Sequence, residues 1–337
     1  MKELVQKKLN DSPFMRWTAL VLVASAMFFA YMFVDVLSPL QTMLETQIGW
    51  SADTYGTFAS SEYFLNVFVF FLIFAGIILD KMGVRFTAIL SGSVMLIGGA
   101  IKLYAISSYF VEGNALYDFL SSFWTSFPAN AKLASAGFAI FGCGVEMAGI
   151  TVSKAIVKWF TGKEMALAMG LEMAIARLGV FAVFSSSPAI SKMFANAAGD
   201  PSIVAPIAFC TVLLIVGLLN FIIFSVMDKK LDSQKGGSTA GASEEEFKVS
   251  DLGKILSSKM FWLVALLCVL YYSAIFPFQR FATNFLEVTL NIPNQEAADL
   301  FRWFPILAMV LTPFLGSFLG HKGKGAPMLM LGALIMI

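Results

Sequence analysis

Long stretches with almost no charged residues constrain this chain more than any other feature of its sequence. The clearest runs from 203 to 227 and contains no Asp, Glu, Lys or Arg. An α-helix rises about 1.5 Å per residue, so about 20 apolar residues cross the hydrocarbon layer of a bilayer. The stretches are too long for the strands of a membrane β-barrel and lack the alternating pattern of such strands. The sequence therefore predicts an all-α membrane protein.

The composition excludes most other classes of protein. Hydrophobic residues make up 58% of the 337 residues and charged residues only 13%, whereas a soluble domain is about 25% charged. Such a chain cannot cover a soluble surface, which excludes a cytosolic enzyme, a disordered chain and a disulfide scaffold. The formal net charge of +1 provides no basic excess, so we expect no nucleic-acid partner.

Eight stretches are long enough to span a bilayer, and a ninth begins near the end of the chain. The predicted helices are about 17–40, 55–79, 86–105, 133–157, 165–190, 203–227, 260–284 and 298–320, and the ninth begins at 326. The ninth stretch is too short to span, so we expect the chain to end inside this helix. The segment 228–259 is rich in Gly, Ser and charged residues and is predicted to be a cytosolic linker.

The distribution of Lys and Arg indicates the orientation. If the N-terminus lies inside, most of the 23 Lys and Arg residues fall in inner segments, among them Lys154, Lys158 and Lys163. Cytoplasmic loops of membrane proteins carry this excess of basic residues. We therefore predict that the N-terminus is cytoplasmic.

A short motif follows the second predicted helix and consists of Gly76, Asp80, Lys81, Gly83 and Arg85. The first glycine would allow close approach of helices, and the second would supply a turn conformation closed to other residues. The aspartate can cap a helix or pair with a basic group. The two basic residues would hold the loop at the inner face. A tight basic turn without further meaning is the alternative interpretation.

The motif recurs in a weaker form at 316–325. The same spacing separates Gly76 from Gly316 and Gly83 from Gly323, and it carries the first three predicted helices onto the seventh, eighth and ninth. The repeat predicts two six-helix halves, residues 1–227 and an incomplete second half at 260–337. The motif resembles the loop signature of the major facilitator superfamily, and this resemblance implies the fold of that superfamily.

Charged residues inside the predicted helices point to a site. Glu146 and Arg177 each lie about halfway along their helices. Because charge near the bilayer centre is costly, these residues either form a structural salt bridge or line one polar substrate site, and binding near the midplane favours the second interpretation. Glu172 lies nearer the inner face and is a candidate for an inner gate or for proton handling. A pair with a loop lysine is the alternative for Glu172.

A second group of charges lies in the outer third of the predicted helices and consists of Asp35, Glu62, Arg280 and Arg302. Asp35 and Arg280 occupy helices that are equivalent under the repeat. We predict that they form a salt bridge that closes the outer mouth. Snorkelling toward the headgroups is an equally good explanation for the arginine.

Three stretches narrow the family. They run from Gly142 to Gly179, from Tyr271 to Phe278 and from Asp35 to Thr42. Together they resemble the branch named major facilitator superfamily domain-containing protein one, a group of lysosomal dipeptide uniporters with bacterial relatives. The resemblance implies that substrate is held by its free amino and carboxyl ends. The matching acid and arginine are Glu146 and Arg177.

A dipeptide fits between an acid and a base, because two residues span about 7 Å. Weaker candidates for the walls of the cavity are Asp35, Tyr271, Tyr272 and Phe278. The predicted outer loops contain no Asn-X-Ser/Thr sequon, so a bacterial inner membrane fits better than a lysosome.

We therefore expect an alternating-access carrier for a dipeptide or another small zwitterion, not an enzyme. The sequence contains one His and no metal-binding motif, so we expect neither a metal nor a cofactor. The expected partners are a small-molecule substrate and the lipid bilayer, with proton coupling left open, and the chain is expected to be a monomer. Carriers of nitrate or organic anions remain alternatives, as does a membrane sensor that transports nothing. A chain ending in the ninth helix should not complete a transport cycle.

Overall fold

The computed structural model describes residues 8–234, 253, 255–307, 309–311 and 325–335. Every longer element in this part of the chain is a helix. In chain order they are α1 (Pro13–Asp35), α2 (Gln41–Ile48), α3 (Ala52–Phe68), α4 (Phe71–Ile106), α5 (Ala115–Ser121), α6 (Ala129–Phe160), α7 (Met165–Met193), α8 (Val204–Gln234), α10 (Lys259–Leu290), α11 (Asn294–Phe301) and α13 (Gly325–Ile335). The prediction of an all-α protein is confirmed for the described residues.

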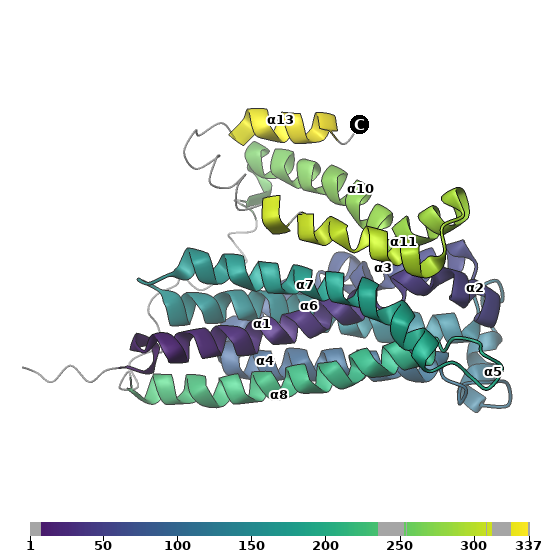
Figure 1. Cartoon of the computed structure of the whole chain (residues 1–337). Coiled ribbons are helices and arrows are strands. Elements are labelled where there is room, and N and C mark those ends of the chain that lie inside the picture. The colour runs from purple at the N-terminus through teal and green to yellow at the C-terminus, as the bar shows by residue number, and fades with distance from the viewer. Residues whose placement is uncertain (1–7, 235–252, 254, 308, 312–324, 336–337) are drawn as a thin grey trace, which may run out of the picture.

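Six helical stretches in the described part are long and apolar enough to cross a membrane. They are Pro13–Ile48, Phe71–Ile106, Ala129–Phe160, Leu167–Met193, Val204–Gln234 and Lys259–Leu290. The chain is therefore a multi-pass membrane protein. Five long helices, α1, α4, α6, α7 and α8, lie side by side in one bundle (Figure 1).

Glycine determines how closely α4 and α6 approach. A Cβ atom built on Gly137 would lie 2.8 Å from the carbonyl oxygen of Gly98, and one built on Gly98 would overlap the backbone of Phe141. The two backbones touch here, as in membrane helices that pack through small residues. The bulky rings of Phe138 and Phe141 fill the space on either side, and both are fully buried.

The second predicted helix does not have the expected boundaries. We expected a continuous helix at 55–79, but α3 ends at Phe68, and Phe70 adopts a left-handed φ of 55° before α4 begins. We expected a break between 79 and 86, and two helical segments of α4 do meet there, at a kink at Gly83. There φ is 79° and ψ is 169°, a conformation essentially restricted to glycine. The predicted role of this glycine is confirmed.

The predicted linker also begins too early. We placed its start at 228, but α8 continues to Gln234. The reason is that two aspartates on this last part are held by basic residues of neighbouring helices. Asp228 accepts hydrogen bonds from Lys158 Nζ at 2.7 Å and Trp159 Nε1 at 3.0 Å, and Asp232 pairs with Arg85 at 2.9 Å.

Only the second half of helix α10 packs against the bundle. Side chains in its first half are exposed, for example Leu263 and Val269, whereas Gln279, Arg280 and Thr283 in its second half are buried. We call the end of the bundle where α1 begins the N-terminal end and the opposite end, where α10 is buried, the latch end. In Figure 1, α10 and α11 lie along one side of the bundle, near α3.

Part of the second half cannot be compared with its prediction. The predicted eighth helix at 298–320 overlaps the end of α11, but 312–324 lie outside the described residues, as does most of the second motif copy at 316–325. The helix α13 begins at Gly325, close to the predicted start of the ninth helix. The division into two six-helix halves stays a prediction.

Candidate functional site

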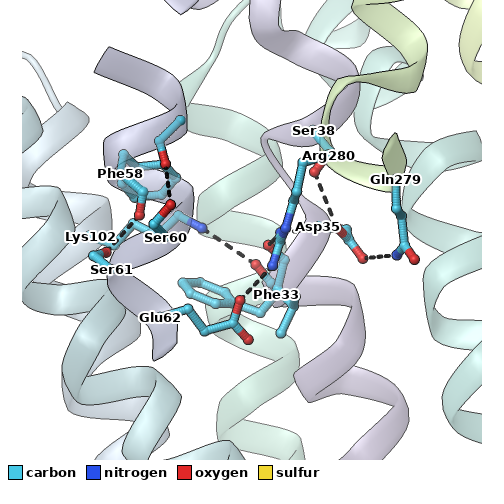
Figure 2. Close-up of polar contacts among 12 residues, drawn as sticks. Phe33, Asp35, Ser38, Phe58, Ser60, Ser61, Glu62, Lys102, Gln279 and Arg280 are labelled. Atoms are coloured by element: carbon cyan, nitrogen blue, oxygen red, sulfur yellow. Dashed lines mark hydrogen bonds and ion pairs between the residues drawn. The ribbon is translucent and has the colours of Figure 1, made fainter. Parts of the chain in front are cut away.

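Arg280 of α10 is buried at the latch end, where it joins the second half to the first. Its guanidinium donates hydrogen bonds to Asp35 of α1 at 2.9 Å and to Glu62 of α3 at 2.5 Å. A third bond reaches the carbonyl oxygen of Val34 at 2.7 Å. Figure 2 shows the guanidinium between the two carboxylates. We call Asp35, Glu62 and Arg280 the latch.

The carboxylate of Asp35 has further donors. Gln279 Nε2 donates to it at 3.0 Å and Ser38 Oγ at 3.1 Å, and Tyr55 Oη donates to Ser38 at 3.1 Å. Buried charges are stable only when ion pairing and hydrogen bonds compensate for lost hydration. The latch meets this requirement with one guanidinium, two carboxylates and several neutral donors.

Neutral and acidic side chains extend the contact around the latch. Thr42 Oγ1 donates to Glu287 at 2.7 Å, and Asn294 Nδ2 donates to the same carboxylate at 3.1 Å and to the Pro39 carbonyl at 2.8 Å. These bonds tie α10 and α11 to the corner between α1 and α2. The latch end is therefore closed by polar contacts between the two parts of the chain.

The predicted ion pair between Asp35 and Arg280 is confirmed as a contact. Sequence reasoning did not identify Glu62 as the second partner, although it placed this residue in the same outer third. The sequence alone does not show where α3 crosses α6, and this crossing sets the direction of the Glu62 side chain. A Cβ atom on Gly142 of α6 would overlap the carbonyl oxygen of Glu62, so a glycine here lets α3 approach closely enough to aim this carboxylate at α10.

The two predicted substrate residues lie in the middle parts of α6 and α7, away from the ends of these helices. Glu146 is half-buried and Arg177 is exposed. Tyr31 of α1 lies within electrostatic range of both side chains and of Glu172. A Cβ atom on Gly179 would overlap the carbonyl oxygen of Phe28, so α7 and α1 touch close to Arg177 and Tyr31.

The structural salt bridge that we considered as an alternative does not form. Within the part of the chain that the structure describes, Glu146, Arg177 and Glu172 make no ion pair and no side-chain hydrogen bond. The alternative of a loop lysine as the partner of Glu172 is likewise not observed there. Charged groups in a membrane protein that lack protein partners ordinarily face a water-filled cavity. The arrangement is therefore able to bind a ligand that carries both charges.

The aromatic candidates on α10 do not join this pair in the described structure. Tyr271 and Tyr272 are about half exposed. Tyr272 stacks on Phe276 at 5.0 Å between ring centroids, and Phe276 meets Tyr63 of α3 at 5.6 Å. Phe278 packs at 5.8 Å against rings on and just after α11, so its contacts are those of helix packing.

The motif residues lie at the N-terminal end. Asp80 pairs with Lys154 at 2.7 Å, which confirms the predicted pairing with a basic group. Lys81 is exposed, and Arg85 pairs with α8 as described above. The prediction for Gly76 is not met among the described residues, because no atom lies within 4 Å of a Cβ atom built there. Gly76 itself is only partly buried, and no neighbouring helix among the described residues comes close enough to require a glycine there.

Two further ion pairs tie the start of α1 to the connection between α6 and α7. Arg16 pairs with Glu164 at 3.0 Å, and Lys163 pairs with Asp11 at 2.9 Å. The pKa of the Glu164 carboxyl is lowered by its own backbone N–H and by the Arg16 guanidinium. The pKa of Asp11 is lowered by Lys163 and by the backbone N–H of Lys8.

A cavity of about 930 Å³ lies elsewhere, between α3, α5 and the start of α6. Its walls are mainly apolar and include the rings of Phe64, Phe68, Trp124 and Phe127. Neither Glu146 nor Arg177 lines it. An apolar groove on the outside of the bundle suits hydrocarbon better than a charged substrate, so we do not assign it to the site.

Comparison with known proteins gives a family and several relatives. The family model described as Major Facilitator Superfamily matches residues 23–337. The lysosomal dipeptide transporter MFSD1 of Homo sapiens is 23% identical over 313 residues, which are 92% of this chain and 62% of that protein. The Gallus gallus protein of the same name is 26% identical over 216 residues, 62% of this chain and 46% of that protein.

A relative with a different name also matches. The probable anion transporter 2, chloroplastic, of Oryza sativa subsp. japonica is 23% identical over 314 residues, 90% of this chain and 52% of that protein. The chain thus spans less than two thirds of the length of these curated relatives.

Proposed function

Because the chain belongs to the major facilitator superfamily, we propose that it is a membrane carrier that moves a dipeptide or a similar small zwitterion by alternating access. The observation that carries the proposal is the pair Glu146 and Arg177. These opposite charges lie on neighbouring helices near Tyr31 and have no ionic partner among the described residues. Several relatives are named as dipeptide transporters, which supports a dipeptide as the substrate.

The chemistry of the pair matches the two ends of a peptide. A guanidinium binds a carboxylate through two parallel hydrogen bonds, so Arg177 would hold the carboxyl end. Glu146 would accept hydrogen bonds from the ammonium end. The two ends of a dipeptide are about 7 Å apart, a distance that an acid and a base on adjacent helices can bridge.

Basic side chains support an orientation for the carrier. Arg16, Lys154, Lys158 and Lys163 all lie at the N-terminal end, where each pairs with an acid. We place this end in the cytoplasm, since basic residues gather on that side of membrane proteins. The latch then closes the outer side, and the exposed first half of α10 faces an opening to the inside. A bacterial inner membrane is the proposed location.

Uptake by proteoliposomes tests the proposal. We expect the full-length protein to take up a labelled dipeptide and the changes Glu146→Gln and Arg177→Lys each to reduce uptake at least tenfold, because each removes one end of the charge pair. A matched control is Arg302→Lys, which alters an arginine whose ionic partner among the described residues is Asp299, three residues away, and which also donates to Ser185 at 3.3 Å. This control should transport normally. Normal uptake by both site variants would contradict the proposed site.

The rice relative supports a second candidate, a carrier of organic anions. Such a carrier needs Arg177 but not Glu146. It would transport an N-acetylated dipeptide as well as the free one, and Glu146→Gln would leave uptake unchanged. A sensor without transport would bind the dipeptide but never accumulate it inside the vesicles.

A further inference from the structure

Lys102 of α4 is fully buried, with 0% of its surface exposed. No carboxylate contacts its ammonium among the residues that the structure describes. Within the described part of the chain, Lys102 Nζ makes one hydrogen bond, to the carbonyl oxygen of Phe33 at 3.4 Å. A lysine buried within a membrane helix without an acid in contact is costly, so its presence requires an explanation.

Three aromatic rings surround the ammonium. Lys102 Nζ lies 4.5 Å from the ring centre of Phe33, 5.2 Å from that of Phe58 and 4.3 Å from that of Phe138. Arg280 lies 5.8 Å from the same Phe138 ring. Faces of aromatic rings attract cations, and the attraction grows when the cation is desolvated. The cage therefore holds a cation beside the latch but out of contact with it.

Charge counting links this cation to the latch. Asp35, Glu62, Lys102 and Arg280 are all buried in one layer, two acids with two bases. Both acids lie within electrostatic range of Lys102. Arg280 is the one member of the four that comes from α10. If α10 moves away from the bundle, Arg280 leaves and Lys102 is the cation that remains beside the two acids.

The geometry allows Lys102 to replace Arg280. Phe58 and Glu62 are four residues apart on α3, so they lie one above the other on the same face, about one turn apart. The ammonium above Phe58 needs to travel only about 5 Å along α3 to reach Glu62. The flexible four-carbon stem of lysine permits such a movement.

We propose that Lys102 is the reserve cation of the latch, which leaves its aromatic cage and pairs with Glu62 when Arg280 withdraws, so that Glu62 stays ionised when the outer side opens and only Asp35 has to take up a proton. This proposal rests on the alternating access proposed above. It gives Lys102 a positioning role, since it acts through Glu62 and not on the substrate.

Among the described residues, the titratable groups that face Glu62 or Lys102 are Tyr31 and Asp35 on α1, Tyr55 and Tyr63 on α3, Glu146 on α6, Cys210 on α8 and Arg280 on α10. Among them Arg280 is the only other cation. Removal of Lys102 therefore leaves the open latch with two acids and no base.

Distances between spin labels test the proposal without any transport assay. The labels are placed on the full-length protein at Thr46→Cys of α2 and Val288→Cys of α10, both exposed at the latch end, with exposed Cys268 changed to Ser. In this background, only Asp35 loses its base on opening, so the ratio of open to closed protein should rise about tenfold for each unit of falling pH between pH 7.5 and 5.5. With Lys102→Met added, Glu62 loses its base as well, so the ratio should rise about a hundredfold for each unit.

Two further variants separate charge from folding. The pair Glu62→Gln with Lys102→Met removes the acid together with its reserve cation and should return the pH dependence to that of the background, because Asp35 is again the one acid of the latch that loses its base. Lys132→Met is the matched control, because Lys132 also lies over a phenylalanine ring, 4.5 Å from Phe123, and donates to the carbonyl oxygens of Leu120 and Phe123 rather than to an acid.

The outcomes distinguish this proposal from the proposed function. Equal pH dependence of opening with and without Lys102 would overturn the role of the lysine even if dipeptide uptake proceeds. If Lys102→Met does not fold, the measurement with Lys102 in place still decides, because a rise of about a hundredfold per pH unit there would also overturn it. If the spin-label distances behave as expected but the protein takes up no dipeptide, only the substrate assignment is overturned.

Discussion

Arg280 shows how much one side chain can hold together in this fold. It neutralises two buried carboxylates, which come from two different helices, and it connects α10 to both of these carboxylates. Sequence reasoning found one of these carboxylates, Asp35, because the repeat makes the first and seventh helices equivalent. It could not find Glu62, because that contact depends on how closely α3 crosses α6.

Arg280→Gln should therefore destabilise the protein strongly, by about 3–5 kcal/mol, since it leaves buried acids without their base. A thermal unfolding scan in detergent measures this. Arg302→Gln is the control, because its partner Asp299 is partly exposed, and such pairs contribute about 0–1 kcal/mol. Equal losses of stability in the two variants would mean that the latch is not a stabilising contact.

Lys102 illustrates a limit of sequence reading at the same scale. Near the end of an apolar stretch, a lysine is ordinarily expected to reach for the headgroups. Here it points inward, because Phe33, Phe58 and Phe138 come from three different helices to form its cage. No local pattern reveals a cage that only the packed bundle creates.

At the scale of the elements, glycines decide where helices cross. On α6, Gly142 lies where α3 crosses and Gly144 lies where α4 crosses, because a Cβ atom on either would overlap the backbone of the neighbouring helix. The break at Phe70 and the extension of α8 to Gln234 were not predictable, since neither carries a Gly or Pro signal and the second depends on ion pairs with distant helices.

Gly142→Ala should destabilise the protein by about 1–3 kcal/mol, because its methyl group would push α6 away from the backbone of Glu62. Gly149→Ala on the same helix is the matched control, since no atom lies within 4 Å of a Cβ atom built there. Chemical or thermal unfolding of the two variants measures the difference. A loss for Gly149→Ala as large as that for Gly142→Ala would refute the crossing as the cause.

The ion pair between Arg16 and Glu164, which connects α1 to the segment between α6 and α7, should weaken in acid. Because the folded state lowers the pKa of Glu164 from its ordinary 4.5, the carboxylate stabilises the fold fully above that pKa. This contribution is lost as the pH falls through the lowered value. The difference in melting temperature between the unmodified protein and Glu164→Gln should thus be largest at neutral pH and disappear in acid. A difference that is constant between pH 7 and pH 3 would be inconsistent with this ion pair.

At the scale of the whole molecule, the sequence predicted the superfamily and a multi-pass membrane protein from uncharged stretches and one repeated motif. It did not predict the conformation, because the state of a carrier depends on contacts between its two parts. Those contacts are concentrated at the latch end, where α10 is buried, while the first half of the same helix is exposed. The described residues thus form a carrier-like bundle that is closed at one end.

Counterflow in proteoliposomes tests the central claim most directly. Vesicles loaded with an unlabelled dipeptide are diluted into a trace of the same dipeptide carrying a label. The account predicts transient accumulation of label when the internal dipeptide has both free ends. It predicts none when either end is blocked, because Glu146 or Arg177 then loses its charged partner. Equal counterflow with free and blocked dipeptides, or none with any of them, would contradict a carrier that holds its substrate between these two residues.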